Sequence, residues 1–150
     1  MTPLESTKAI LAHTRDASLG TLEGESPFVS ASPFLFESEP GEKLGSLYLF
    51  LSDLARHTKN LKRHGVVSLL VVEEGPETSV LERARVTILG NVERVTDAET
   101  EERLREQYRA RVSLAEMLLS LPDFHFYRLL PREVHWIGGF GLAQTFKVTG

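Results

Sequence analysis

The clearest hydrophobic pattern lies in the middle of the chain, where two apolar runs flank a short basic segment. The runs 47–51 and 66–72 have the length and composition of buried strands. Ser52 or Asp53 is a natural N-cap for a helix between them, and Gly65 stands where the glycine after a helix belongs. The pattern therefore predicts a strand, a helix and a second strand, and this unit organises the rest of the chain.

The predicted helix has an apolar face and a basic face. On a helical wheel Leu54, Thr58 and Leu61 fall in one narrow arc, which we expect to be buried. The side chains on the opposite side and its flanks are Arg56, His57, Lys59, Lys62, Arg63 and His64. The start of such a helix suits a phosphate group, because free N–H groups and the helix dipole favour an anion. A solvated basic face balanced by acidic neighbours explains the same pattern, and the residues alone leave both interpretations open.

The segments around this unit are mostly strand-like. In chain order they are a helix over 3–15, strands over 18–22, 28–37 and 81–95, a broken helix from 96 to 121, and strands over 124–130 and 133–137. For the broken helix we expect Leu104, Tyr108, Val112 and Met117 to point inward. Pro33 marks an edge, a bulge or an interruption in its strand, and Gly90 marks a bulge or bend.

This element pattern predicts an α+β fold that is mainly β. About six or seven strands in consecutive hairpins favour a small closed or split β-barrel with peripheral helices over a doubly wound sheet. The bend expected at Gly90 is of the kind that closes small barrels. With 150 residues the chain fits a single domain over 1–150.

Composition narrows the chemistry. The chain has no cysteine, which removes disulfides, thiolate metal sites and cysteine nucleophiles. A net charge of −4 argues against broad binding of nucleic acid. No apolar run approaches a membrane span and the first residues lack a leader pattern, so we expect a cytoplasmic protein without a membrane anchor. The five histidines lack metal-binding spacing and we expect no metal site, although His125 and His135 could approach each other.

Three segments in this order resemble the pyridoxamine 5′-phosphate oxidase-like, FMN-binding split barrels. They read FLSDLARHTKNLKRHGVVSLLVV, RARVTILGNVERV and FYRLLPREVHWIGGFGLA. The resemblance covers nearly the whole chain, residues 5–146, and is closest to the haem-utilisation (HugZ-type) branch. In that branch a Ser-Asp-Leu-Ala-x-His-Thr-x-Asn-Leu segment and a terminal Gly-Gly-Phe-Gly recur.

The resemblance implies FMN at a homodimer interface, with its phosphate at the start of the basic helix. The site residues it implies are Arg56 and Lys59 on the phosphate, Thr58 and His57 assisting them, Ser52 near the ribityl chain or flavin edge, and Ser30, Ala31 and Ser32 along the ring. Trp136 and Phe140 could pack on the flavin, on the partner subunit or in the core. No catalytic residue is assigned.

The sequence also departs from parts of the family. It lacks the C-terminal Arg-x-His pair of true pyridoxamine phosphate oxidases, so we do not expect that reaction. Haem-degrading members usually have a C-terminal domain or extension that helps to bind haem, whereas this sequence ends at Gly150. The main hypothesis is a homodimeric FMN-dependent oxidoreductase of unknown substrate. The alternatives are a haem-binding or haem-degrading protein on the same scaffold and a non-catalytic flavin carrier.

Overall fold

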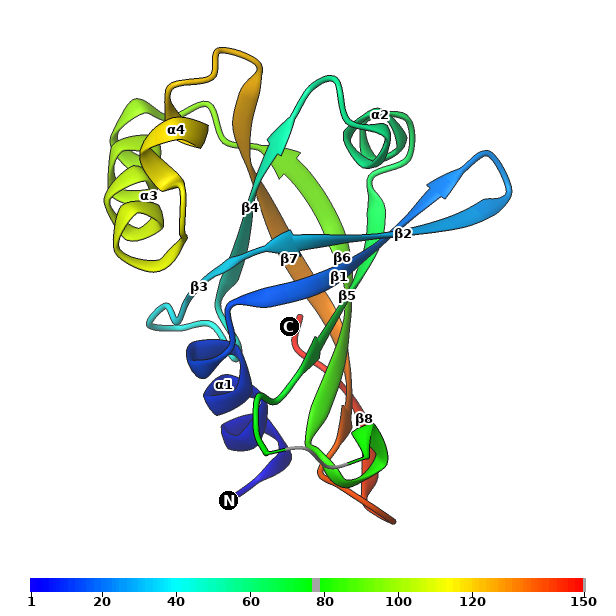
Figure 1. The fold of residues 1–150 in the computed structure, drawn as a ribbon. Helices are drawn as coiled ribbons and strands as arrows, with labels where there is room; N and C mark the ends of the chain where they lie inside the picture. The colour runs from blue at the N-terminus through cyan, green and yellow to red at the C-terminus, as the bar shows by residue number, and fades with distance from the viewer. Residues whose placement is uncertain (77–78, 150) are drawn as a thin grey trace.

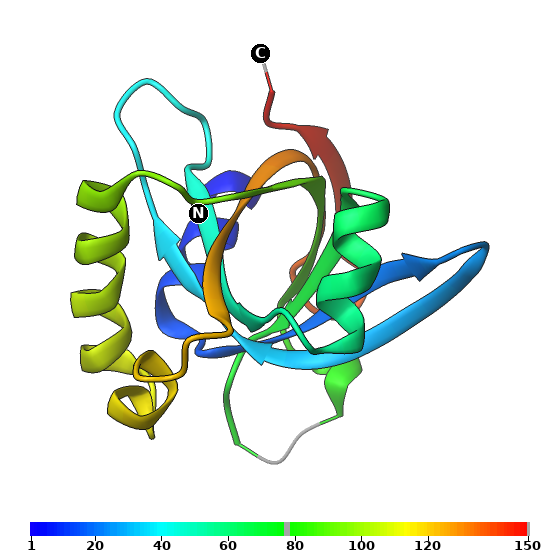
Figure 2. The same cartoon turned by 90° about the horizontal axis from the view of Figure 1, so that it is seen from above.

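An eight-stranded antiparallel sheet forms the body of the molecule. The computed structural model describes residues 1–76 and 79–149. The strands are β1 Asp16–Glu23, β2 Ser26–Pro33, β3 Leu35–Glu37, β4 Ser46–Ser52, β5 Val66–Val72, β6 Arg85–Arg94, β7 Phe124–Ile137 and β8 Ala143–Lys147. Their order is β2-β1-β5-β6-β7-β4-β3, with β8 paired to β7. Figure 2 looks along the curled sheet and shows it closing part of the way into a barrel, so the expected mainly-β class is confirmed.

The helices lie around the outside of this sheet. They are α1 Pro3–His13, α2 Arg56–Arg63, α3 Ala98–Arg111 and α4 Ala115–Leu119, with a short 3₁₀ turn η1 Val80–Glu82. In Figures 1 and 2 α3 and α4 cover one side, whereas α2 lies on the other side beside the β1–β2 hairpin. Across the described ranges no helix is both long and apolar enough to cross a membrane.

Strand β4 separates two hydrophobic cores. Leu47 and Leu49 pack in the larger core, together with α1 and the inner face of β1, β5, β6 and β7. Tyr48 and Phe50 point the other way, into the core under α3 and α4. Since both faces of β4 are covered, its side chains are apolar at successive positions rather than at alternate ones.

A bulge bends the sheet where β6 meets β7. Gly90 pairs with Pro131 while Leu89 pairs with Glu133, so Arg132 is an extra residue on β7. The bend predicted at Gly90 is confirmed. The two final strands predicted around Pro131 are instead one continuous strand. The proline is tolerated there because it lies at the bulge, where the regular pairing is already interrupted.

The limits of α2 correct the prediction made from its cap. The helix begins at Arg56 after Ala55, which provides no side-chain cap. Ser52 accepts a hydrogen bond from the Leu54 N–H in a preceding turn, 3.1 Å away. Leu54 is therefore outside the helix and 74% exposed, so its predicted burial was wrong. The buried residues of α2 are Thr58, Asn60 and Leu61, while the four basic side chains are exposed as expected.

Other helices and strands also begin or end at residues that differ from the predicted ones. The first helix ends at His13 rather than at residue 15, and a capping box of Thr2 and Glu5 fixes its start. The interruption expected at Pro33 is confirmed, because it divides 28–37 between β2 and β3. Leu114 adopts a left-handed conformation, φ 64°, which resets the helical phase before α4. Met117 is consequently 53% exposed instead of buried.

Candidate functional site

An open pocket of about 270 Å³ lies between β2, β4, the start of α2, and the helices α3 and α4. It is lined by Ala31, Ser32, Pro33, Phe50, Leu51, Ser52, Ala55, His57, Tyr108, Leu118 and Phe124. We call it the β2–α4 pocket. Four of the eight predicted site residues line it, namely Ala31, Ser32, Ser52 and His57. The structure therefore brings together residues that the sequence separates by more than twenty positions.

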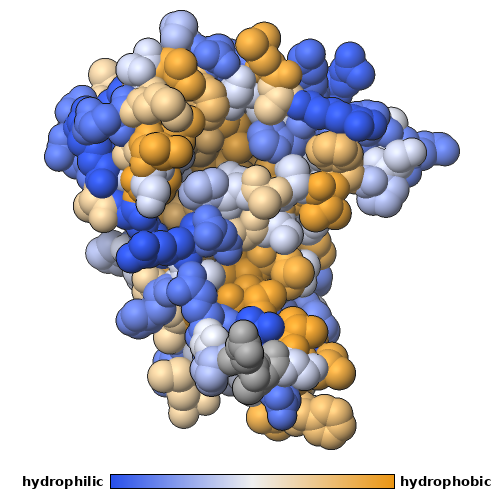
Figure 3. Space-filling view, in the orientation of Figure 1, coloured by the Kyte–Doolittle hydropathy of each residue, from blue (hydrophilic) through white to orange (hydrophobic). Residues whose placement is uncertain are grey.

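Aromatic rings form one wall of the β2–α4 pocket. The ring centroids of Tyr108 and Phe124 lie 5.1 Å and 5.3 Å from that of Phe50. Burial raises the pKa of Tyr108 to about 12, so its hydroxyl stays protonated at neutral pH. Figure 3 shows hydrophobic atoms gathered over α4 on this side of the molecule. The wall offers an uncharged surface to a flat apolar ligand.

His57 supplies the titratable group at this pocket. Its Nδ1 lies 2.7 Å from Ser30 Oγ, which fixes the orientation of the ring. Burial lowers the pKa of His57 below its ordinary value, so the imidazole is neutral at pH 7. Within the described ranges Nε2 has no hydrogen-bond partner. A neutral imidazole with one free nitrogen can bind a metal centre or exchange a proton.

The two serine hydroxyls at the pocket bond to other groups of the protein. Ser52 donates to Asp123 Oδ2 at 2.5 Å, and this bond joins the end of β4 to the start of β7. Ser32 is buried and donates to the carbonyl of Pro33 at 2.8 Å. A ligand hydrogen bond to either hydroxyl must therefore compete with an existing one. Ala31 is exposed and contributes only a small surface.

Arg56 and Lys59 lie on the solvent side of α2 and are not among the residues that line the pocket. Arg56 donates to both carboxylate oxygens of Glu23, from Nε at 2.6 Å and from a terminal nitrogen at 2.7 Å. Its guanidinium also lies 4.6 Å from the ring centroid of Phe28. In the described structure the Lys59 side chain makes no ion pair or hydrogen bond. Of the two cations predicted to hold a phosphate, one is paired with a carboxylate.

Thr58 and Asn60 face the interior rather than the solvent. Thr58 is fully buried, and its Oγ1 has no hydrogen-bond partner among the residues described. Asn60 donates from Nδ2 to Thr21 Oγ1 at 3.1 Å, which ties α2 to β1. Asn60 is thus a positioning residue in the interior.

The remaining residues considered from the sequence lie elsewhere. His125 and His135 are both on β7, ten positions apart along one strand, so they do not approach each other. His125 instead lies 3.0 Å from the Asp53 carboxylate. Trp136 packs against the larger core and donates to Ser6 Oγ at 3.0 Å. Phe140 is 87% exposed at the turn between β7 and β8.

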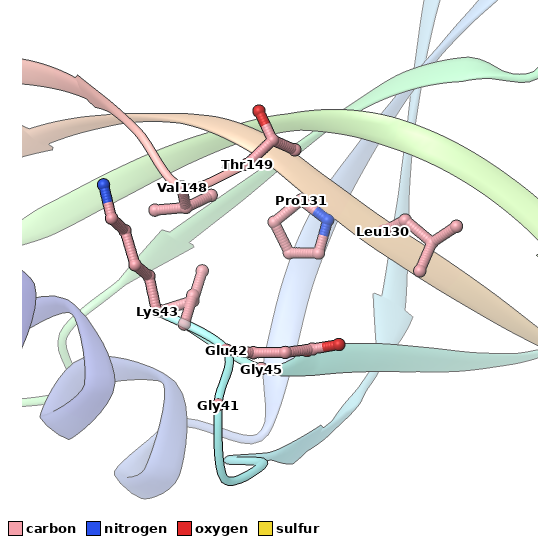
Figure 4. Close-up of a pocket in the computed structure, with 9 residues that line it drawn as sticks. Gly41, Glu42, Lys43, Gly45, Leu130, Pro131, Val148 and Thr149 are labelled. Atoms are coloured by element: carbon pink, nitrogen blue, oxygen red, sulfur yellow. The ribbon is translucent and has the colours of Figure 1, made fainter.

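A larger pocket of about 410 Å³ lies beside the bulge in the middle of β7 (Figure 4). It is lined by Gly41, Glu42, Lys43, Leu44, Gly45, Leu130, Pro131, Val148 and Thr149. It contains no aromatic or imidazole side chain and none of the predicted site residues. The smaller β2–α4 pocket is therefore the better candidate site, because aromatic rings and two groups with shifted pKa values, His57 and Tyr108, line it.

The sequence pattern does not reveal most of the pocket wall or the partner of Arg56. Phe50 and Tyr108 were recognised only as core positions, and Phe124 only as the start of a strand. The sequence of β4 could not show that Phe50 faces away from the barrel, because its side chains are apolar at successive positions. No sequence signal links Glu23 to Arg56, since their contact depends on where the β1–β2 hairpin lies.

Comparison with known proteins agrees with this architecture. Residues 4–149 match the family model described as CREG, beta-barrel. The haem oxygenase HutZ of Vibrio cholerae is 30% identical over 138 residues, which cover 88% of this chain and 73% of that protein. A haem-binding protein from Mycobacterium smegmatis has a TM-score of 0.84 at 28% identity, over 98% of this chain and 58% of that one. This chain thus spans little more than half of the Mycobacterium protein.

A putative pyridoxamine 5′-phosphate oxidase from Listeria innocua shares the fold. Its TM-score is 0.70 at 17% identity, covering 92% of this chain and 100% of that one. The curled sheet and its flanking helices therefore define a pyridoxamine 5′-phosphate oxidase-like split barrel. The chain belongs to the CREG beta-barrel family, on the haem-utilisation (HugZ-type) branch of these split barrels.

Proposed function

We propose that this protein binds haem and takes part in haem utilisation. The observation that carries the proposal is the neutral, half-buried His57 at the edge of the aromatic-walled β2–α4 pocket. The names of the Vibrio and Mycobacterium relatives, a haem oxygenase and a haem-binding protein, support the same ligand. This was an alternative at the level of the sequence, and it now has more support than the flavin hypothesis.

The residues of the pocket suit a haem group. A neutral histidine commonly binds haem iron, and His57 would hold it here through its free Nε2. Ser30 would hold the ring through Nδ1, as partners of ligating histidines do. Phe50, Tyr108 and Phe124 would contact the apolar porphyrin. Lys59, exposed on α2, would pair with a propionate. When bound, the haem iron would supply oxygen binding or activation.

A second copy of the chain is proposed to complete the site. The pocket of about 270 Å³ is open and lies below the 300–1,000 Å³ that is usual for ligand sites. Homodimerisation, implied by the family resemblance, would cover its open side. A cytoplasmic location belongs to the same proposal, and cell fractionation would test it.

FMN is the second candidate ligand. The observation that favours it is the start of α2, which has no acidic residue in its first turn and no side-chain cap. A flavin phosphate there would contact Arg56 and Lys59, with Ser30, Ala31 and Ser32 near the ring. Reduction of bound flavin by NADH or NADPH would separate an oxidoreductase from a non-catalytic flavin carrier.

One absorption experiment separates the two ligands. The purified protein is mixed with haem or, separately, with FMN, and unbound ligand is removed by gel filtration. Haem retained with a defined Soret band supports the proposal. FMN retained without haem would replace it with the flavin candidate, and retention of neither ligand would reject both.

A further inference from the structure

Arg56 holds the Glu23 carboxylate with the same two-point geometry with which an arginine binds a free anion. Glu23 ends β1, immediately before the two-residue turn of the hairpin, and Arg56 is the first residue of α2. Two hydrogen bonds of 2.6 and 2.7 Å join the guanidinium to the carboxylate, with the Phe28 ring on the guanidinium face. Figures 1 and 2 show the hairpin projecting beside α2. A carboxylate of the chain therefore occupies the fork of Arg56.

This ion pair is not needed to hold the hairpin against α2. The buried hydrogen bond from Asn60 to Thr21 already joins β1 to the helix. The side chains of Arg56 and Glu23 are 64% and 37% exposed, and exposed pairs contribute little to stability. The pair nevertheless persists across neutral pH, because the Arg56 guanidinium holds the pKa of Glu23 below its usual value.

Lys59 differs from Arg56 in having no such partner. It lies three residues further along α2, hence on the same side of the helix, and its side chain makes no contact with a carboxylate in the part of the chain described. Hydrophilic atoms cover this corner of the molecule in Figure 3. The exposed side of α2 therefore carries two cations in different states. Lys59 is available to a ligand, whereas Arg56 is already paired with Glu23.

We infer that Glu23 is a specificity-determining residue, which makes the Arg56–Lys59 surface of α2 select phosphate groups over carboxylates. A ligand carboxylate offers Arg56 the same two oxygens as Glu23, but Glu23 is tethered and has the higher effective concentration. A phosphate dianion has three oxygens and a second charge, so it can bridge Arg56 and Lys59 while Glu23 moves away. The inference rests on the flavin candidate's placement of a phosphate at α2. Because Arg56 is paired with Glu23, Lys59 is then the one of these two cations that a haem propionate can bind.

The test uses free anions, so that it depends on neither cofactor. Inorganic phosphate and, separately, acetate are titrated into the full-length ¹⁵N-labelled protein at about pH 7.5, and the amide shifts of residues 56–59 are followed. Glu23→Gln is compared with Glu25→Gln, which removes the same charge from the exposed hairpin turn without touching Arg56. We expect phosphate to bind about fivefold more tightly to Glu23→Gln, and acetate binding to become measurable. Glu25→Gln should change the phosphate affinity less than twofold.

The variant Lys59→Ala separates two possible failures: that Glu23 does not compete with the ligand, and that phosphate does not bind at α2. If it weakens phosphate binding while Glu23→Gln behaves like Glu25→Gln, phosphate binds at α2 but Glu23 does not compete, and the inference fails alone. If phosphate moves none of these amides in any variant, the placement of a phosphate at α2 fails as well. The haem proposal is judged separately, by the absorption experiment. Circular dichroism confirms that each variant is folded.

Discussion

Replacing Gly90 with alanine tests the bend that shapes the barrel. A Cβ built on Gly90 would lie 2.4 Å from the carbonyl oxygen of Leu130 and 2.8 Å from Leu129 Cδ2. The first of these atoms belongs to the backbone of β7 and cannot rotate away. Because ordinary contact begins near 3.4 Å, β6 and β7 must separate locally by about 1 Å.

The expected loss of stability follows from that displacement. Forcing an extra methyl group into packed structure costs about 1–3 kcal/mol, and contact with backbone places Gly90→Ala in the upper part of this range. For a chain of this length, a loss of about 2 kcal/mol lowers Tm by roughly 4–8 °C. Gly65→Ala is the matched control, since its Cβ would lie 3.6 Å from the nearest neighbour, the carbonyl oxygen of Val92. It should change the unfolding free energy by less than about 1 kcal/mol, in either direction.

Urea unfolding followed by circular dichroism and by the fluorescence of the single tryptophan measures both variants. The reasoning predicts a clear gap between them, with Gly90→Ala the less stable. Unfolding free energies that agree within about 0.5 kcal/mol would refute it, because the bulge would then accommodate a side chain without strain.

Three further predictions concern single side chains. Asn60→Ala should cost about 1–3 kcal/mol in urea unfolding, because it leaves the buried hydroxyl of Thr21 without its donor; a cost below about 0.5 kcal/mol would contradict this. Because burial lowers the pKa of His57 below 6.5, the unfolded chain takes up a proton first as the pH falls. The stability is full above about pH 6.5 and declines below it, and His57→Leu should flatten that decline in urea midpoints measured from about pH 7.5 to pH 5. Arg111→Ala removes hydrogen bonds to the carbonyls of Leu11, Ala12 and Thr14 at the C-terminal end of α1, and should cost about 1–3 kcal/mol in thermal unfolding, with Arg111→Lys closer to wild type.

The sequence predicted the sheet where burial controls the residue pattern. The runs in β4 and β5 are apolar because both faces of β4, and one face of β5, meet the cores, and their limits were nearly right. β8 was missed because four of its five residues are exposed and it has no apolar pattern, so only its pairing with β7 defines it. The start of α2 was misplaced because Ser52 bonds to Asp123, 71 residues away, as well as to the turn.

In the candidate site too, some residues could be predicted from the sequence and others could not. Four residues that the family resemblance named, Ala31, Ser32, Ser52 and His57, line one pocket, and their role in binding a ligand stays a prediction. Their partners could not be predicted, because they come from distant elements. The pair of Arg56 with Glu23 depends on the path of the hairpin, and no local pattern records that path.

The most direct test of the haem proposal is a haem titration of the wild type, His57→Leu and His64→Leu. Both histidines belong to the end regions of α2, but His64 is exposed at its C-terminal cap, away from the lining of the β2–α4 pocket. The account predicts a shifted Soret band for the wild type and for His64→Leu, and at least a tenfold loss of affinity with an altered band for His57→Leu. A His57→Leu variant that binds haem with the affinity and spectrum of the wild type would contradict it.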